Sequence, residues 1–376
     1  MTPAAFPDRR AAGKRLLVVA PDGGIHHAAR SALRDLLGPG DLLVANDAAT
    51  IPASLRGRHE RTGAEVEVRL AGRRSLRAED VRAFTAVVFG EGDHRTRTEE
   101  RPAPPELRTG DVLALGPLIA TVTALLNHPR LVEVRFAGSP QGIWAGLAAH
   151  GAPIQYAHLE PELALWDVWT GVAAFPAAFE APSAGFLLDW RLLADLRRRG
   201  VAFATLTHAA GLSSTGDPAL DARLPLDEPY RIPATTVAAI RRAWEGDGRV
   251  IALGTTVTRA LEHAASGPGG LRPGAGLADQ RIGPHTLLWA VDGIVSGVHG
   301  LGDSHYDVLR AFAPAGVLAR ASTELEAGGY RSHEFGDAVM VLRRGREAVA
   351  VPLRSRRVRR STRLPGSAHT GRARTA

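Results

Sequence analysis

The stretch Arg249-Val-Ile-Ala-Leu-Gly-Thr-Thr-Val-Thr-Arg-Ala-Leu-Glu262 decides the fold of this chain. Val250 to Leu253 is a short apolar run with β-branched residues, which is typical of a strand buried on both faces. Gly254 allows an abrupt turn, and Thr255 or Thr256 can cap a helix that begins directly after it. Apolar residues then recur at helical spacing, at Val257, Ala260, Leu261 and Ala264.

This strand, turn and helix predict a binding site at the helix N-terminus. Several backbone N–H groups are unpaired at such a terminus, and the helix dipole favours a carboxylate or phosphate there. An ordinary strand–helix unit of an α/β core is the alternative, and it stays open on these residues alone.

The composition is that of a folded chain with one large or two medium domains. The chain has 376 residues, of which 45% are hydrophobic. It has no cysteine, which excludes disulfides and thiolate metal sites. Because no apolar run reaches about 18 residues and the N-terminus does not resemble a signal peptide, we expect a cytoplasmic protein without a membrane partner. A monomer and a weak dimer both remain open.

The positive charge is concentrated in the last 24 residues. The segment from Leu353 to Ala376 has eight arginines and no acid. Since the whole chain has a net charge of +7, the rest of the chain has a net charge of about −1. The segment has no apolar periodicity, and we expect a disordered tail that could bind a nucleic-acid backbone non-specifically. A solvated tail without a partner is the alternative.

Strand and helix patterns alternate on both sides of a β-rich block. Strands are expected at 15–20, 41–45, 201–206, 250–253, 286–295 (with a hairpin at Asp292-Gly293) and 335–342, and helices at 28–37, 189–199, 235–245, 306–312 and 318–327. Between them, short strands at 65–70, 84–89, 111–115, 119–123 and 131–136 suggest a small β-barrel. We therefore predict a large mixed α/β domain (1–54 and 153–352) with an inserted β-barrel domain (55–152), and a ligand site in the cleft between them.

Short motifs in a fixed order give the chain a resemblance to a known family. They are Pro39 to Asn46, Ile51 to Ala53 with Leu55 and Gly57, Ala181 to Gly185, Thr205-Leu206 with Gly211, Glu228, Gly254 to Thr256 with Arg259 and Leu261-Glu262, Val291-Asp292 with His299, and Tyr330-Arg331 with Phe335 to Ala338. Together they resemble the S-adenosylmethionine:tRNA ribosyltransferase-isomerase family of queuosine biosynthesis, collinearly from about Arg15 to Leu342.

The resemblance implies both a fold and a reaction. The fold is a large α/β domain with an inserted β-barrel. The reaction moves the ribosyl group of S-adenosylmethionine to the aminomethyl group of a 7-deazaguanine in tRNA and isomerises it, which gives epoxyqueuosine and releases adenine and methionine. S-adenosylmethionine is thus a substrate and tRNA a partner, and no metal or redox cofactor is implied.

The chemistry needs a clamp for the methionine end of the cosubstrate and a base beside the sulfonium. Arg259, one turn into the helix, is placed to hold the carboxylate, and a surface pair with Glu262 is the alternative. The other candidate binding residues are Gly254, Thr255, Thr256, Asn46, Pro182, Ser183, Ala184 and Gly185, which could equally cap a helix or form turns. The candidate catalytic residues are His299, Asp303, Glu228 and Asp337, each of which could instead be structural.

The chain departs from the family pattern at several polar positions. Leu187 stands where the family has a histidine, and Thr207-His208 shifts another by one position. Further departures are Arg223 and Leu226 before Glu228, Ala49 and Ser54 near Ile51-Pro52, Ile154-Gln155-Tyr156, and Ser296 to Ser304. Ribosyl transfer to a non-tRNA acceptor and an inert binding paralogue on the same fold therefore stay as alternatives.

Deleting residues 353–376 should weaken RNA binding and its salt dependence without changing the affinity for S-adenosylmethionine. The slope of log affinity against log salt falls by about 0.7 to 0.9 for each phosphate contact that is lost. Titrations of labelled RNA at several salt concentrations measure this slope. An unchanged slope would show that the tail does not contact RNA.

Overall fold

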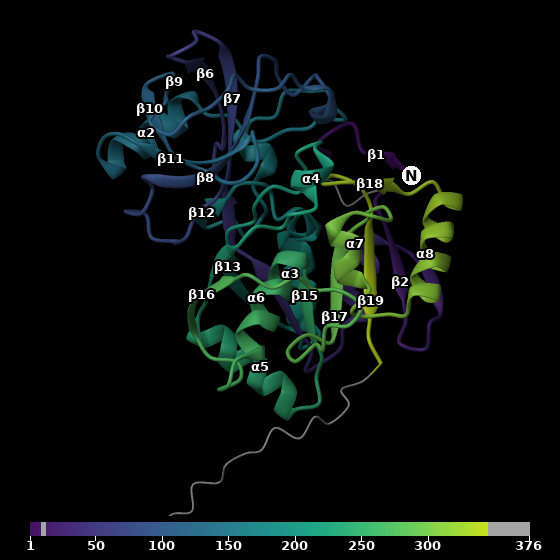
Figure 1. The fold of residues 1–376 in the computed structure, drawn as a ribbon. Coiled ribbons are helices and arrows are strands. Elements are labelled where there is room, and N and C mark those ends of the chain that lie inside the picture. Colours follow the sequence, from purple (N-terminus) through teal and green to yellow (C-terminus); the bar gives the residue numbers. More distant parts are fainter. Residues whose placement is uncertain (9–12, 345–376) are drawn as a thin grey trace, which may run out of the picture. The chain divides into compact units, whose positions relative to one another are not determined.

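The computed structural model describes residues 1–8 and 13–344 (Figure 1), so the predicted basic tail at 353–376 lies outside the described residues. Its largest sheet has nine strands in the order β16-β14-β13-β4-β15-β17-β19-β2-β3. Their bounds are β2 Arg15–Val19, β3 Ile25–Ala29, β4 Leu42–Asn46, β13 Ala202–His208, β14 Glu228–Ile232, β15 Val250–Leu253, β16 Gly274–Ala278, β17 Gly293–Gly297 and β19 Ala338–Leu342.

The strand that decides the fold lies in the middle of this sheet. β15 pairs in parallel with β4 on one side and with β17 on the other. Val250 and Ala252 pack into the core on one face, and Ile251 and Leu253 pack into the core on the other. The predicted strand buried on both faces is thus confirmed.

Helices cover both faces of the nine-stranded sheet. On one face lie α5 Ala234–Glu245, α6 Thr255–Ser266, α7 Ser304–Leu309 and α8 Ala315–Ala327. On the other face lie α1 Leu33–Leu36, α3 Trp190–Arg198 and the 3-10 helix η4 Ser183–Leu187. The short remaining elements are β1 Thr2–Pro3, η1 Arg30–Ala32, β5 Ala48–Thr50, η2 Thr98–Glu100, η3 Leu165–Val168, β12 Phe175–Ala178, α4 Pro218–Asp221 and β18 Arg331–Ser332.

Six antiparallel strands close into a barrel in the order β10-β11-β8-β7-β6-β9. They are β6 Ser54–His59, β7 Glu65–Gly72, β8 Ala83–Phe89, β9 Val112–Leu115, β10 Leu118–Leu125 and β11 Leu131–Phe136, followed by α2 Pro140–His150. Closure between β6 and β9 requires a glycine at position 57, because a Cβ there would lie 2.0 Å from the carbonyl oxygen of Ala114. The mixed α/β fold with a closed barrel confirms the predicted fold class.

The chain enters and leaves the barrel at neighbouring points. Ser54 and Ala152 exchange two backbone hydrogen bonds, each 2.9 Å long. The predicted division into domains at 54/55 and 152/153 stays a prediction, because the described residues all fall in one compact unit.

Three predictions of local structure are wrong. Residues 28–37 are not one helix, because Ile25–Ala29 pairs antiparallel with β2 as an edge strand before η1 and α1 begin. Asp292-Gly293 is not a hairpin: it leads into β17, and the Asp292 carboxylate accepts a hydrogen bond from the Val250 N–H at 2.9 Å. Strands β14 and β16 were not predicted.

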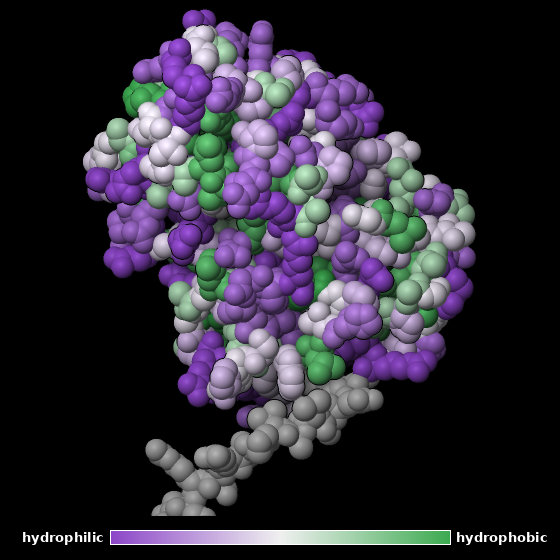
Figure 2. All heavy atoms as spheres, viewed as in Figure 1, coloured by the Kyte–Doolittle hydropathy of each residue, from purple (hydrophilic) through white to green (hydrophobic). Residues whose placement is uncertain are grey.

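The surface of the described residues is mainly polar. On the face in Figure 2, hydrophilic side chains predominate and hydrophobic ones form small scattered groups. In the described part of the chain, no helix combines the length and the apolar character that crossing a membrane requires.

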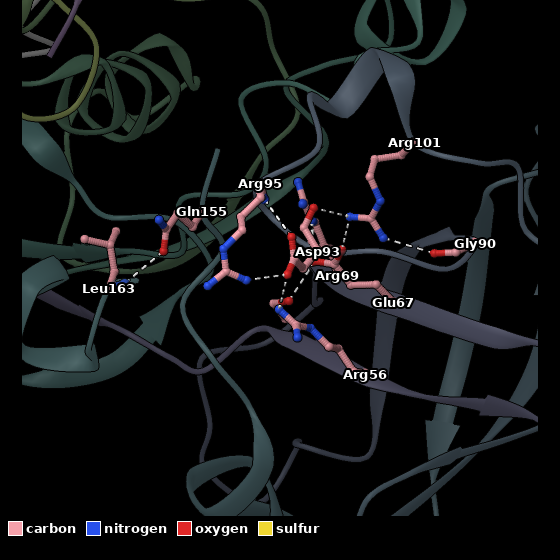
Figure 3. Close-up of polar contacts among 10 residues, drawn as sticks. Arg56, Glu67, Arg69, Gly90, Asp93, Arg95, Arg101, Gln155 and Leu163 are labelled. Carbon is pink, nitrogen blue, oxygen red and sulfur yellow. Dashed lines mark hydrogen bonds and ion pairs between the residues drawn. The ribbon is translucent and has the colours of Figure 1, made fainter. Parts of the chain in front are cut away.

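A buried ionic network joins three segments of the barrel (Figure 3). The exposed fractions of Glu67, Arg69 and Arg101 are 3%, 1% and 3%. Arg69 Nε donates to Glu67 Oε1 at 2.7 Å, Arg101 donates to Glu67 Oε2, and Arg101 Nη2 donates to the Gly90 carbonyl at 3.0 Å. Burial opposes ionisation of Glu67, but the two guanidinium groups together have the larger effect and lower its pKa to about 2.

Replacing Glu67 with Gln should lower the free energy of unfolding by about 3–5 kcal/mol at pH 7, because two buried guanidinium groups lose their counter-charge. The pKa of Glu67 is depressed by folding, so its contribution is complete above about pH 4.5 and is lost as the pH falls toward about 2. Urea unfolding at pH 7 and pH 3 measures it, and the difference between the two proteins should shrink at pH 3. The control Glu79→Gln removes an exposed pair with Arg77 and should leave stability unchanged.

Candidate functional site

A pocket opens where three parallel strands of the large sheet end. The segments that follow β13, β15 and β17 line it, together with η4 and α7. Ligands of open α/β sheets commonly bind at the carboxyl ends of the strands. An inner part has a cavity volume of about 140 Å³ and continues into an outer chamber of about 980 Å³; the two share Glu180, Ala181, Ser183, Ser213, Leu224, Arg281, His299, Ser304, His305 and Asp307.

The N-terminus of α6 forms one wall of the inner pocket. Gly254 is the N-cap residue with φ of 100°, and no side chain caps the helix. The prediction that Thr255 or Thr256 caps it is therefore wrong, because the helix already begins at Thr255. Within the described residues, the backbone N–H groups of Thr255 and Thr256 donate no hydrogen bond. These N–H groups can donate hydrogen bonds to an anionic group in the pocket.

The floor of the inner pocket is a buried ion pair. Arg259 pairs with Glu228, and the two residues are 4% and 5% exposed. Arg259 Nη2 also donates to the carbonyls of Ala278 (2.9 Å) and Gln280 (3.1 Å). The predicted alternative pair of Arg259 with Glu262 does not form. Arg259 lines the pocket, but most of its donors have partners, whereas the N–H groups at the N-terminus of α6 are free for an anionic ligand.

A buried histidine lies beside this ion pair. His208 is fully buried, with Nε2 3.4 Å from Glu228 Oε2. Burial and the nearby Arg259 lower the pKa of His208 well below its ordinary value. Burial raises the pKa of Glu228, while Arg259 opposes that rise. His208 does not line the pocket, and in the described residues its ring nitrogens make no hydrogen bond.

Asp303 holds two imidazole rings side by side at the boundary of the inner pocket and the outer chamber. His299 Nδ1 lies 2.9 Å from Asp303 Oδ2, and His305 Nδ1 lies 3.0 Å from Asp303 Oδ1. The rings stack with centroids 4.4 Å apart at 10°. Asp303 is also the N-cap of α7, since it accepts from the His305 backbone N–H at 3.0 Å. With both Nδ1 atoms bonded to Asp303, each ring keeps Nε2 for a ligand.

The pKa values of the two stacked histidines shift in opposite directions. Burial and the charge of His305 lower the pKa of His299. Burial also acts to lower the pKa of His305, but the hydrogen bond to Asp303 and the charges of Asp303, Glu180 and Glu228 together raise that pKa. Asp303, although buried, has its pKa lowered by both imidazoles. At neutral pH the pair offers a neutral imidazole beside a more basic one.

Glu180 lies at the junction of the inner pocket and the outer chamber. Its carboxyl group contacts the Tyr156 hydroxyl and accepts from the Ser213 N–H at 3.1 Å. Burial raises the pKa of Glu180 to about 7, against the opposing hydrogen bond from Tyr156. Tyr156 follows Gln155, whose side chain orders the loop through a 2.9 Å hydrogen bond from the Leu163 N–H (Figure 3).

Not all predicted site residues lie in the pocket. Pro182, Ser183 and Ala184 line it, together with Gly254, Thr255, Thr256, Arg259, Glu228 and His299. Gly185 instead packs against Thr170, where a Cβ would lie 2.7 Å from Thr170 Cγ2.

Two further predicted residues support the site or lie away from it. Asn46 is buried behind the pocket, where its amide donates to the His208 carbonyl at 2.9 Å and accepts from the N–H groups of Ala48 and His208. Asp337 accepts from the N–H groups of Arg15 and Arg331 at 2.8 and 2.9 Å, and it does not line the inner pocket or the outer chamber. Its geometry is that of a structural carboxylate.

Sequence reasoning missed Glu180, Tyr156 and His305. Glu180 directly precedes the Ala181–Gly185 motif, and His305 lies two residues after Asp303. An acid next to a small-residue turn, and a second histidine next to a helix cap, are the local signals that could have found them.

Comparison with known proteins finds relatives of this chain that share one name. The family model described as queuosine biosynthesis protein matches residues 2–341. The S-adenosylmethionine:tRNA ribosyltransferase-isomerase of Pelobacter propionicus is 32% identical over 347 residues, 90% of this chain and 95% of the relative. The protein of the same name from Geobacter sulfurreducens is 35% identical over 343 residues, 87% of this chain and 92% of the relative.

A solved S-adenosylmethionine tRNA ribosyltransferase from Thermotoga maritima is similar at 23% identity, with a TM-score of 0.48; the match covers 90% of this chain and 96% of that chain.

Replacing Asp303 with Asn should lower the pKa of His305, because the carboxylate that stabilises the imidazolium is removed. Asn also caps helices well, so α7 keeps its start. Histidine ring nitrogens followed by NMR against pH measure the change. Asp307→Asn, on the same helix but paired with Arg310, is the matched control. An unchanged pKa of His305 in Asp303→Asn would contradict this account of the pair.

Proposed function

Because the chain belongs to the queuosine biosynthesis protein family, we propose that it transfers and isomerises the ribosyl moiety of S-adenosylmethionine onto 7-aminomethyl-7-deazaguanine in tRNA. The product would be epoxyqueuosine in tRNA, with adenine and methionine released. The observation that carries the proposal is the juxtaposition of a free helix N-terminus and an ordered imidazole pair in one pocket.

The inner pocket would bind the cosubstrate. The methionine carboxylate would lie against the backbone N–H groups of Thr255 and Thr256, where the helix dipole stabilises it. Ala184 and Gly254 permit close approach, since neither carries a long side chain. The Arg259–Glu228 pair would set the depth of the pocket and hold the α6 terminus in place.

The imidazole pair would move the protons. His299, whose pKa is lowered, would take the proton from the carbon next to the sulfonium through its free Nε2. His305, whose pKa is raised, would give a proton to the departing adenine. Two titratable groups with pKa values pushed apart by their surroundings are the usual basis of such a division of labour.

Glu180 would hold the amino group of the acceptor. It lies at the junction where an acceptor in the outer chamber meets a ribosyl group in the inner pocket. A pKa of about 7 would let its carboxylate bind the ammonium form and then take up the proton that the amine must lose before it can attack.

Three departures from the family pattern lie outside the inner pocket, whereas Ser296 and Ser304, from another departing segment, line it. Leu187 packs into the core under the sheet, and Leu226 packs against the barrel core. Arg223 donates to the Leu126 carbonyl at 2.8 Å. None of the three lines the inner pocket, which supports retention of cosubstrate binding.

A small cationic acceptor is the second candidate, favoured by the charge of the outer chamber. Two arginines (Arg97 and Arg281) line the chamber, against six acids: Glu99, Glu180, Asp221, Asp303, Asp307 and Glu334. Such a wall attracts an ammonium group and repels phosphates. An aminomethyl-deazapurine that is not part of tRNA would fit this charge. An inert binding paralogue is the third reading, and any turnover eliminates it.

Incubation with S-adenosylmethionine and tRNA carrying the aminomethyl-deazaguanine should release adenine and methionine together. His299→Asn should lower kcat by at least about 100-fold, the usual scale of general-base catalysis, with little change in cosubstrate affinity. His285→Asn, an exposed histidine outside the pocket, is the control.

Three outcomes separate the candidates. Release with modified tRNA supports the tRNA reaction, and release only with the free deazapurine supports the second candidate. Intact binding of S-adenosylmethionine without any release would overturn both.

A further inference from the structure

Two histidines and a glutamate meet on the wall of the outer chamber, outside the groups assigned to transfer. His158 comes from the loop after α2, and His333 and Glu334 come from the turn between β18 and β19. One ligand atom from each lies within 4.8 Å of the others. His158 Nε2 is 3.2 Å from Glu334 Oε2, and the two imidazole rings stack with centroids 4.7 Å apart at 26°.

The backbone holds these three side chains in place from both sides. His333 has φ of 67°, a left-handed conformation that residues other than glycine rarely adopt. Its N–H donates to the Val298 carbonyl at 3.2 Å, and its carbonyl accepts from the Gly336 N–H at 2.9 Å. The loop that carries His158 is fixed by Gln155, which donates to the Pro161 carbonyl at 2.7 Å. The cluster is thus presented by ordered segments.

The carboxylate of this cluster has a histidine as its ion-pair partner. Within residues 1–8 and 13–344, the only ion pair of Glu334 is with His158, and neither an arginine nor the lysine reaches it. In the same residues the His333 imidazole makes no hydrogen bond and contacts its neighbour only by stacking. Both imidazoles can therefore turn a ring nitrogen toward the glutamate.

We propose that His158, His333 and Glu334 bind one divalent transition-metal ion, with Zn²⁺ as the best match. Two imidazole nitrogens and one carboxylate oxygen are a common donor set for zinc, whereas Mg²⁺ and Ca²⁺ prefer oxygen ligands alone. Tetrahedral zinc needs ligand atoms roughly 3.4 Å apart, given bonds of about 2.0–2.1 Å. Small side-chain rotations close the present spacing to that value. The fourth position would face the chamber, open to water or to an oxygen of a ligand.

The neighbouring cluster of His299, Asp303 and His305 has the same composition but is already satisfied. Both oxygens of Asp303 bond an imidazole, and one of them also caps α7. A metal ion there would compete with these contacts for the oxygens of Asp303. This difference assigns the ion to the His158 cluster.

The test uses the full chain, freed of metal with EDTA and then titrated with Zn²⁺ alone by calorimetry at pH 7.5. We expect one ion per chain. His158→Gln, His333→Gln and Glu334→Gln should each weaken Zn²⁺ binding by at least about tenfold. Cobalt substitution should give the intense visible bands of a four-coordinate site, and they should be lost in the same variants.

Two controls make the assignment sharp. His27→Gln removes a remote, half-exposed histidine paired with Glu324 and should leave Zn²⁺ binding unchanged. His305→Ala tests the neighbouring cluster, and loss of binding there alone would overturn the assignment. No binding at all, or binding unaffected by the three ligand variants, would also overturn it. Thermal unfolding of each variant confirms that it is folded, and because S-adenosylmethionine is absent, the outcome does not depend on the proposed reaction.

Discussion

The buried pair of Arg259 and Glu228 is the interaction on which the pocket depends. Through it, helix α6 is joined to strand β14, and the same guanidinium reaches the carbonyls of Ala278 and Gln280. Glu228 in turn accepts from the Gly211 N–H at 2.5 Å. Removing two charges from water is costly, and the cost is offset only when every donor and acceptor has a partner. Here the partners come from α6, β14, the end of β16 and the loop at Gly211, so the pair fixes where those segments meet.

Above this ion pair, the parallel strands set where the pocket lies, and the segments that follow them carry its polar side chains. The parallel strands β15 and β17 end side by side, and the N-terminus of α6 therefore points its free N–H groups into the space beyond them. His299 and Glu180 come from loops and His305 from the first turn of α7, and Asp303 and Tyr156 contact them. The free N–H groups, the imidazole pair and Glu180 are thus separate features, brought to connected cavities by the topology.

The sequence predicts those parts of the fold in which a local pattern and the tertiary structure agree. Val250 to Leu253 is apolar at every position because both faces are buried, and period two in Glu65–Leu70 reflects a barrel strand. Strand β3 was missed because an edge strand with His26, His27 and alanines buries little. The partner of Arg259 could not be predicted: spacing favours Glu262, three residues away, yet Glu228 lies 31 residues away. The lining of the outer chamber could not be predicted residue by residue for the same reason, since it comes from segments between Pro3 and Glu334.

The two backbone hydrogen bonds between Ser54 and Ala152 have a consequence for how the barrel segment can evolve. They bring the two ends of the barrel segment together, so an exchange of everything between them leaves the sheet with one short gap to rejoin. Residues 54–152 contribute nothing to the inner pocket, but they place Arg97, Thr98 and Glu99 on the outer chamber. Selection can therefore change the wall of the outer chamber through the barrel without changing a residue of the inner pocket. In the proposed reaction, the acceptor and the cosubstrate could then be selected independently.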